Sequence, residues 1–92
     1  MTNVLTVHFW ASARAATGSD QAILDISEPL TLADLRRRLV ADHPEGGRQH
    51  LEKVLSACSV LVGDRPVGSA DPEEVRLVPG DTVEFLPPFA GG

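Results

Sequence analysis

The chain has 92 residues, which is enough for one small domain with a modest core and too little for a second catalytic domain. Apolar residues make up 42% of the sequence and charged residues 23%, so the composition is that of a folded chain rather than a disordered one. A net charge of -5 disfavours nucleic acid and anionic membranes as partners. The sequence shows neither a bilayer-spanning apolar run nor a secretory signal, and its single cysteine, Cys58, has no partner for an internal disulfide. We therefore expect a cytoplasmic protein.

The first segments of the chain predict two neighbouring strands. Residues Val4 to Trp10 are rich in β-branched and aromatic side chains, and alternation along a strand places one set of them on the core face. That set is Leu5, Val7 and Phe9. Ala13 to Thr17 predicts one helical turn closed by Gly18, and Gln21 to Ile26 predicts a second strand. Two strands this close in sequence favour a hairpin with a wide connection.

Two helices are predicted in the middle of the chain. Thr31 and Asp34 have the spacing of a capping box, which marks the start of a helix. Apolar residues then recur at helical spacing until a stop near Asp42. They are Leu32, Leu35 and Leu39. A shorter helix, from about Arg48 to Ala57, repeats the pattern.

The remainder of the chain predicts short strands joined by tight turns. Ser59 to Val62 is followed by the turn Gly63-Asp64 and by an edge strand that contains Pro66. A type II turn at residues 78–81 precedes a last strand, Thr82 to Leu86. This order of elements predicts an α+β fold of the ubiquitin-like β-grasp type, with a mixed sheet and one main helix packed on one face.

The C-terminal residues carry the feature with the clearest chemical meaning. Gly91 and Gly92 directly follow the run Pro87-Pro88-Phe89-Ala90. Six residues reach ~20 Å when extended, and glycine allows an active site to close on the backbone from all sides. We expect residues 1–88 to form the folded domain and residues 89–92 to form a flexible tail.

The α-carboxylate of Gly92 is the candidate reactive group. It is ionised at neutral pH and must be activated before a nucleophile can attack it. Joining it to AMP would create a mixed anhydride, which a sulfur or amine nucleophile could open to a thiocarboxylate or an amide. The sequence contains no phosphate-binding loop pattern. We therefore expect no bound cofactor, and ATP to be used by a separate activating enzyme.

Two segments contain distinctive motifs. Pro79 to Gly92 has a Gly-Asp turn, a Val-x-Phe strand, Pro-Pro and a terminal Gly-Gly, and it resembles the C-terminal signature of the MoaD/ThiS sulfur-carrier family. Phe9 to Gly18 is similar to the aromatic-Ala-x-x-Arg-x-x-x-Gly segment of the MoaD-type branch, the small subunit of molybdopterin synthase. The ThiS-type branch, which serves thiamine synthesis, usually lacks the second segment. The middle, Pro44 to Asp71, is generic.

The resemblance implies a carrier that is not an enzyme by itself. In this family an E1-like, MoeB-type enzyme adenylates the terminal glycine, and a sulfur donor protein supplies the sulfur of a thiocarboxylate. A MoaE-type large subunit then uses that sulfur to build the dithiolene of molybdopterin. By this match Gly92 is the acyl carrier and Gly91 is its flexible neighbour.

Three other functions are alternatives to a sulfur carrier for molybdopterin synthesis. A carrier for thiamine or cysteine synthesis would use the same chemistry at Gly92. A ubiquitin-like protein modifier would join Gly92 to lysines of target proteins. A plain interaction module would use an exposed surface around Trp10 and would not need the two terminal glycines.

A partner surface is predicted beside the tail. If Leu5, Val7 and Phe9 face inward, Trp10 faces outward, and the same alternation turns Leu86 outward. The first and last strands are neighbours in a β-grasp, so these side chains would lie close together beside the tail. The candidate partner-binding residues are Trp10, Leu86, Pro87, Pro88, Phe89 and Ala90. In the alternative, Trp10 folds over the sheet edge as local core.

Other functional groups give weaker signals. The histidines and Cys58 match no metal-binding spacing, so no metal site is expected. Cys58 is predicted to be a small buried side chain. Arg36-Arg37-Arg38 is predicted to be the solvated face of its helix.

Overall fold

A five-stranded mixed sheet, a short second sheet and three helices make up residues 3–43 and 47–88, which are the residues that this computed structural model describes. The elements in chain order are β1 Val4–Phe9, α1 Ala11–Thr17, β2 Gln21–Asp25, β3 Leu30–Thr31, α2 Leu32–Asp42, α3 Arg48–Ala57, β4 Ser59–Val62, β5 Arg65–Pro66, β6 Arg76–Leu77 and β7 Thr82–Leu86.

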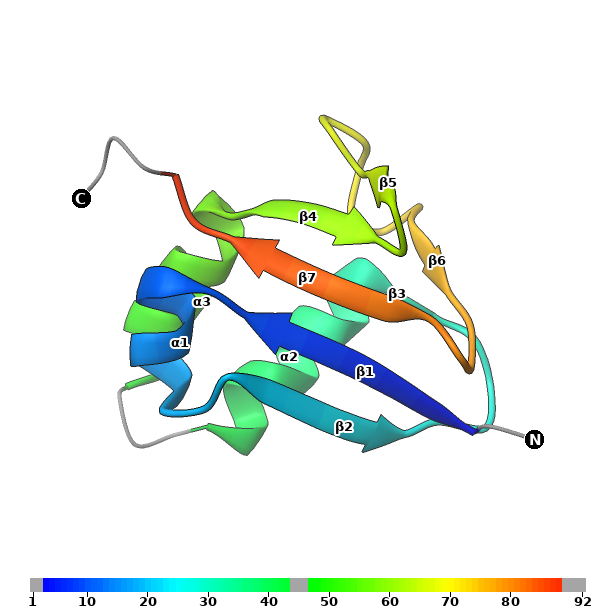
Figure 1. Cartoon of the computed structure of the whole chain (residues 1–92), viewed down its shortest axis with the longest axis horizontal. Helices are drawn as coiled ribbons and strands as arrows, with labels where there is room; N and C mark the ends of the chain where they lie inside the picture. The colour runs from blue at the N-terminus through cyan, green and yellow to red at the C-terminus, as the bar shows by residue number, and fades with distance from the viewer. Residues whose placement is uncertain (1–2, 44–46, 89–92) are drawn as a thin grey trace.

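The first and last strands lie side by side at the centre of the main sheet (Figure 1). The strand order is β2-β1-β7-β4-β5. β1 pairs antiparallel with β2 and parallel with β7, with Val7 opposite Val83 and Phe9 opposite Phe85. β7 pairs antiparallel with β4, and β4 with the two-residue strand β5. The predicted contact between the first and last strands is therefore confirmed.

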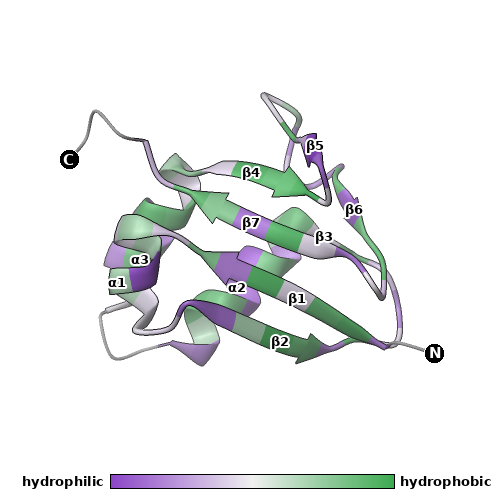
Figure 2. Ribbon diagram, viewed as in Figure 1, coloured by the Kyte–Doolittle hydropathy of each residue, from purple (hydrophilic) through white to green (hydrophobic). Residues whose placement is uncertain are grey.

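The core lies between the main sheet and the helices. Every second residue of the two central strands β1 and β7 is buried, because successive side chains of a strand point to opposite faces of the sheet. The rings of Phe9 and Phe85 stack with their centroids 6.1 Å apart. Helices α2 and α3 supply leucines spaced by three or four residues, as predicted. These are Leu32, Leu35, Leu39, Leu51 and Leu55. Figure 2 shows the apolar segments that run along β1, β4 and β7.

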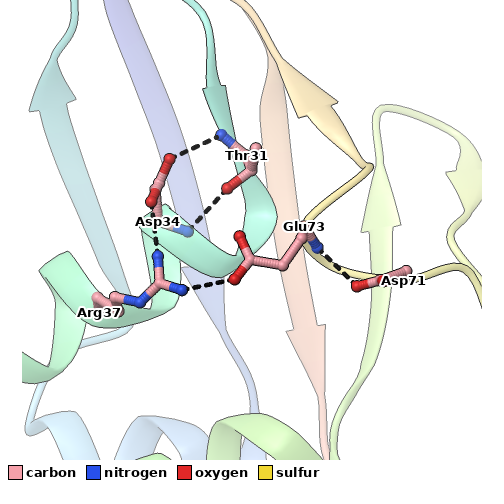
Figure 3. A network of polar contacts seen from close by, with 5 residues as sticks. All are labelled: Thr31, Asp34, Arg37, Asp71 and Glu73. Atoms are coloured by element: carbon pink, nitrogen blue, oxygen red, sulfur yellow. Dashed lines mark hydrogen bonds and ion pairs between the residues drawn. The ribbon is translucent and has the colours of Figure 1, made fainter.

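The start of α2 is fixed by a network of polar side chains (Figure 3). Thr31 Oγ1 accepts a hydrogen bond from the Asp34 amide at 3.0 Å, and Asp34 Oδ2 accepts one from the Thr31 amide at 3.5 Å. The predicted capping box is therefore present. Arg37 forms ion pairs with Asp34 at 2.6 Å and with Glu73 at 2.7 Å, which link α2 to the segment before β6.

The structure differs from the sequence prediction in the connection between β1 and β2 and in the second sheet. The helix α1 begins at Ala11 rather than Ala13, so the connection is a two-turn helix closed by Gly18 at φ 75°. Ala11 itself has a φ of 47°, which an L-residue seldom adopts. The antiparallel pair β3 and β6 was not predicted, because each strand has only two residues and no periodicity.

Candidate functional site

The end of β7 is anchored in the middle of the sheet. The Phe85 carbonyl accepts a hydrogen bond from the Trp10 amide at 3.2 Å, and Leu86 lies opposite Ser59 of β4. Leu86 and Pro87 are half-buried, whereas Pro88 is exposed. The segment that follows therefore leaves from a strand that is held on both sides.

Four of the predicted site residues lie outside the described residues. They are Phe89, Ala90, Gly91 and Gly92. Their predicted roles as partner-binding residues and as the acyl carrier stay predictions.

Trp10 lies next to this strand end and faces solvent. Its side chain is 51% exposed and is not part of the buried core. The predicted outward orientation is therefore confirmed, and Trp10 is not local core. Its backbone carbonyl accepts hydrogen bonds from the amides of Ala13 at 2.9 Å and Arg14 at 3.3 Å, so the residue joins the end of β1 to the start of α1.

Glu84 holds the Trp10 indole in place, and sequence analysis missed this residue. The indole Nε1–H donates to Glu84 Oε1 at 3.2 Å, across the β1–β7 pair. The parallel register also places Glu84 opposite His8 on the solvent side of the sheet. Only that register brings positions 10 and 84 together, so no local sequence pattern could have identified the pair.

Cys58 is a poor nucleophile in this environment. The side chain is half-buried against the core, and its Sγ donates to the Val54 carbonyl oxygen at 3.2 Å. Loss of hydration raises the thiol pKa to about 11, which the positive charge of Arg36 only partly opposes. The predicted role as a small packing residue fits this geometry better than a catalytic role does.

The three consecutive arginines of α2 have different environments. Arg37 and Arg38 are exposed, as predicted. Arg36 is not part of the solvated face: it is half-buried, and its Nε is buried without a hydrogen-bond partner among the described residues. It lines a shallow groove between α2 and α3 together with Val40 and Leu55.

Neither a grouped set of metal ligands nor a membrane-spanning helix is found in residues 3–43 and 47–88. No three His, Cys, Asp or Glu side chains there lie close enough together to hold a metal ion. No helix in these ranges has the length and apolar character that a bilayer crossing requires.

Two curated relatives match almost the full chain, and both are named molybdopterin synthase sulfur carrier subunit. The one from Aspergillus niger is 36% identical over 86 residues, covering 94% of this chain and 91% of the relative. The one from Emericella nidulans is 37% identical over 92 residues, covering 94% of both chains.

Solved structures show the same fold. The HVO 2177 protein from Haloferax volcanii superposes with a TM-score of 0.74 at 28% identity, covering 99% of this chain and 88% of that chain. A complex of subunits 1 and 2 of the molybdopterin-converting factor from Helicobacter pylori contains a chain that superposes with a TM-score of 0.59 at 22% identity. That match covers 97% of this chain and 99% of the other. The architecture is the ubiquitin-like β-grasp that the order of elements predicted.

The sequence model of the ThiS family matches residues 7–92, a range that includes Trp10, the whole of β7 and both terminal glycines. The family match, the relatives and the fold agree over nearly the full length, and the chain belongs to the ThiS family.

Proposed function

We propose that this chain is the sulfur-carrier subunit of a molybdopterin synthase and that it carries sulfur as a thiocarboxylate on Gly92. The observation that carries this proposal is the match to two sulfur carrier subunits at 36% and 37% identity over most of both chains. The family match also extends through Gly91 and Gly92, where the chemistry would occur. The protein would act as a carrier and would supply no general acid or base of its own.

The proposed chemistry has two steps at the Gly92 α-carboxylate. In the first, a carboxylate oxygen attacks the α-phosphorus of ATP, pyrophosphate leaves, and an acyl adenylate forms. In the second, hydrosulfide attacks the carbonyl carbon, the bond from that carbon to the phosphate oxygen breaks, AMP leaves with the electron pair, and the S–H proton is lost to water. The product is the thiocarboxylate. An E1-like, MoeB-type enzyme would bind the ATP, and a sulfur donor protein together with a thiol reductant would be the source of the hydrosulfide.

The structure supports this role through the position of β7, the strand that precedes residues 87–92 in the sequence. β7 lies between β1 and β4, so the end of this strand at Leu86 has a defined position and direction. A rigid base lowers the conformational entropy that a partner must remove when it orders the tail. The partner would enclose the segment of residues 89–92, while Trp10, Leu86, Pro87 and Pro88 would contact the rim of its channel.

A MoaE-type large subunit is the proposed partner that uses the thiocarboxylate. The Helicobacter pylori protein with this fold was solved together with a second subunit of the same factor, which supports a two-subunit synthase. The exposed Trp10 beside the base of the tail is the kind of aromatic residue that often dominates binding at an interface.

The direct test is the intact mass of the chain after incubation with a MoeB-type enzyme, ATP and a sulfide donor. We expect a mass gain equal to the replacement of one oxygen by sulfur, localised to Gly92 by fragmentation. A matched variant with one alanine added after Gly92 should show no such gain, because the glycine carboxyl group is then an amide. An unchanged mass of the unmodified chain would overturn the carrier proposal, and lysine-linked adducts would favour the protein-modifier alternative.

Trp10→Ala tests the docking surface separately from the tail chemistry. We expect binding to the large subunit to weaken by about tenfold or more, as for a central aromatic contact. Val78→Ala is the matched control, because Val78 is 42% exposed but does not lie at the tail. Equal binding of both variants, measured by calorimetry with unchanged thermal unfolding, would contradict the role of Trp10.

A further inference from the structure

Strand β2 forms an outer edge of the main sheet (Figure 1). Within the described residues, it pairs on one side only, with β1. It is five residues long, contains no proline, and carries Ile23, whose side chain is 61% exposed. Exposed edge strands of this kind are ready-made sites for pairing with another strand.

The hydrogen-bonding direction of each β2 residue follows from its register with β1. The Phe9 amide donates to the Asp20 carbonyl and the Ile26 amide donates to the Asn3 carbonyl, both at 2.9 Å. Between these two points, β2 residues whose N–H and C=O groups point toward β1 alternate with residues whose groups point away from it, as in any antiparallel pair. The N–H and C=O groups of Gln21, Ile23 and Asp25 therefore point away from β1.

The opposite edge of the sheet is protected against pairing. β5 has only two residues, Arg65 and Pro66, and proline cannot donate a hydrogen bond to a neighbouring strand. Its short length and its arginine are also features that natural proteins use to block edge association. The two edges therefore differ, and only β2 offers a continuous row of outward donors and acceptors.

We propose that two copies of this chain associate through β2, in antiparallel register about a two-fold axis at Ile23. A two-fold axis requires a self-complementary surface, and an antiparallel pair of identical strands provides one. Ile23 would lie opposite Ile23 of the second copy, and Gln21 opposite Asp25. The main sheets of the two copies would then form one continuous sheet. This association is independent of the proposed carrier chemistry, because it does not involve the tail.

The side chains at this edge suit that register. The exposed Ile23 side chains would pack against each other on the solvent face, which removes the most exposed large apolar side chain of the structure from water. The pairing of Gln21 with Asp25 puts no like charges directly opposite each other. A register offset by one residue would place Ile23 opposite Ala22 or Leu24, which face the other side of the sheet, so alternation excludes it. A register offset by two residues would place Ile23 opposite Gln21 or Asp25, so only the register centred on Ile23 keeps the apolar contact.

One existing contact at the edge is compatible with the dimer. Arg38 Nη2 donates to the outward carbonyl of Asp25 at 3.4 Å. A carbonyl oxygen has two lone pairs, so it can accept this long contact and a strand hydrogen bond at the same time. Arg38 therefore does not block the edge.

The test is sedimentation equilibrium of the full chain from about 0.01 to 1 mM at an ionic strength of about 0.15 M. A strand-to-strand contact is a small interface, so we expect weak association, with the average mass rising toward twice the monomer mass at the highest concentrations. Ile23→Lys places two ammonium groups opposite each other and should weaken association by about tenfold or more. Gln21→Lys places an ammonium group opposite Asp25 and should strengthen it by roughly threefold.

Gln49→Lys is the matched control for net charge. Gln49 is exposed on α3, so this variant changes the charge by the same amount as the others without altering β2. It should associate like the unmodified chain. A mixture of Ile23→Lys and Ile23→Glu should recover the association that each variant loses alone, because Lys then faces Glu. A chain that stays monomeric up to about 1 mM, or association that Ile23→Lys does not change, would overturn the proposal.

Discussion

The Trp10 side chain is positioned by a hydrogen bond to the Glu84 carboxylate. Removal of that carboxylate should therefore change the mobility of the indole ring. Trp10 is the only tryptophan, so intrinsic fluorescence reports on its environment alone. Glu84→Ala removes the acceptor of the indole N–H. We expect lower fluorescence anisotropy, because the indole gains rotational freedom, and a loss of at most about 1 kcal/mol in unfolding free energy. Glu84→Gln keeps an acceptor and should retain the original anisotropy. Equal anisotropy of the alanine and glutamine variants would show that Glu84 does not hold the indole.

The thiol of Cys58 should make the fold less stable at high pH. Its pKa in the folded chain is raised from the ordinary 9.0 to about 11, so the unfolded chain loses its proton first. Between these two pH values the unfolded state binds fewer protons, and the unfolding free energy therefore falls as pH rises. Urea denaturation at pH 8 and pH 10 should show a smaller decrease for Cys58→Ala than for the unmodified chain. An identical decrease in both would contradict the raised pKa.

At the scale of single elements, the capping box should determine much of the stability of α2. Thr31→Ala removes the acceptor of the Asp34 amide and should lower the unfolding free energy by about 1 kcal/mol. Thr31→Ser keeps a hydroxyl group and serves as the control. Arg37→Ala should cost less, because the ion pairs of Arg37 are exposed to solvent. If Thr31→Ser lost as much stability as Thr31→Ala in urea denaturation, the hydroxyl group would not be the cause.

How well each element could be predicted depends on whether nearby or distant residues in the sequence define it. The start and end of α2 depend on residues within the helix and its cap, and both were predicted correctly. The β3–β6 pair joins Leu30 to Leu77, and nothing local marks either strand. The start of α1 was also missed, because Ala11 adopts a positive φ that alanine does not favour. Local chemistry therefore predicted the longer elements, whereas an unusual backbone conformation at Ala11 and the long-range pairing of β3 with β6 account for what was missed.

At the scale of the whole molecule, the order of elements was enough to predict the β-grasp, but not the details of the site. The outward orientation of Trp10 followed from alternation along β1. Its hydrogen bond to Glu84 depends on the register between two strands at opposite ends of the chain, and alternation alone does not define a register. The half-buried position of Arg36 likewise depends on how α3 packs against α2.

We also expect residues 1–88 to fold without the four residues that follow. All buried core side chains of the described residues lie between Leu5 and Phe85, so a chain truncated after Pro88 keeps every one of them. Its unfolding temperature should lie within about 2 °C of that of the full chain, which corresponds to less than about 0.5 kcal/mol. A large fall in unfolding temperature, measured by calorimetry, would show that the last four residues contribute to the fold.

The parallel pairing of β1 with β7 also constrains when the protein can fold. Val7 pairs with Val83, so the centre of the sheet closes a loop that contains most of the chain. Such contacts are costly in entropy and slow to form. During synthesis on a ribosome, β1 emerges well before β7 and cannot pair with it until β7 has left the exit tunnel. The apolar residues of β1 therefore remain without their native neighbour until then, and the centre of the sheet can form only after the whole segment from β1 to β7 has been synthesised.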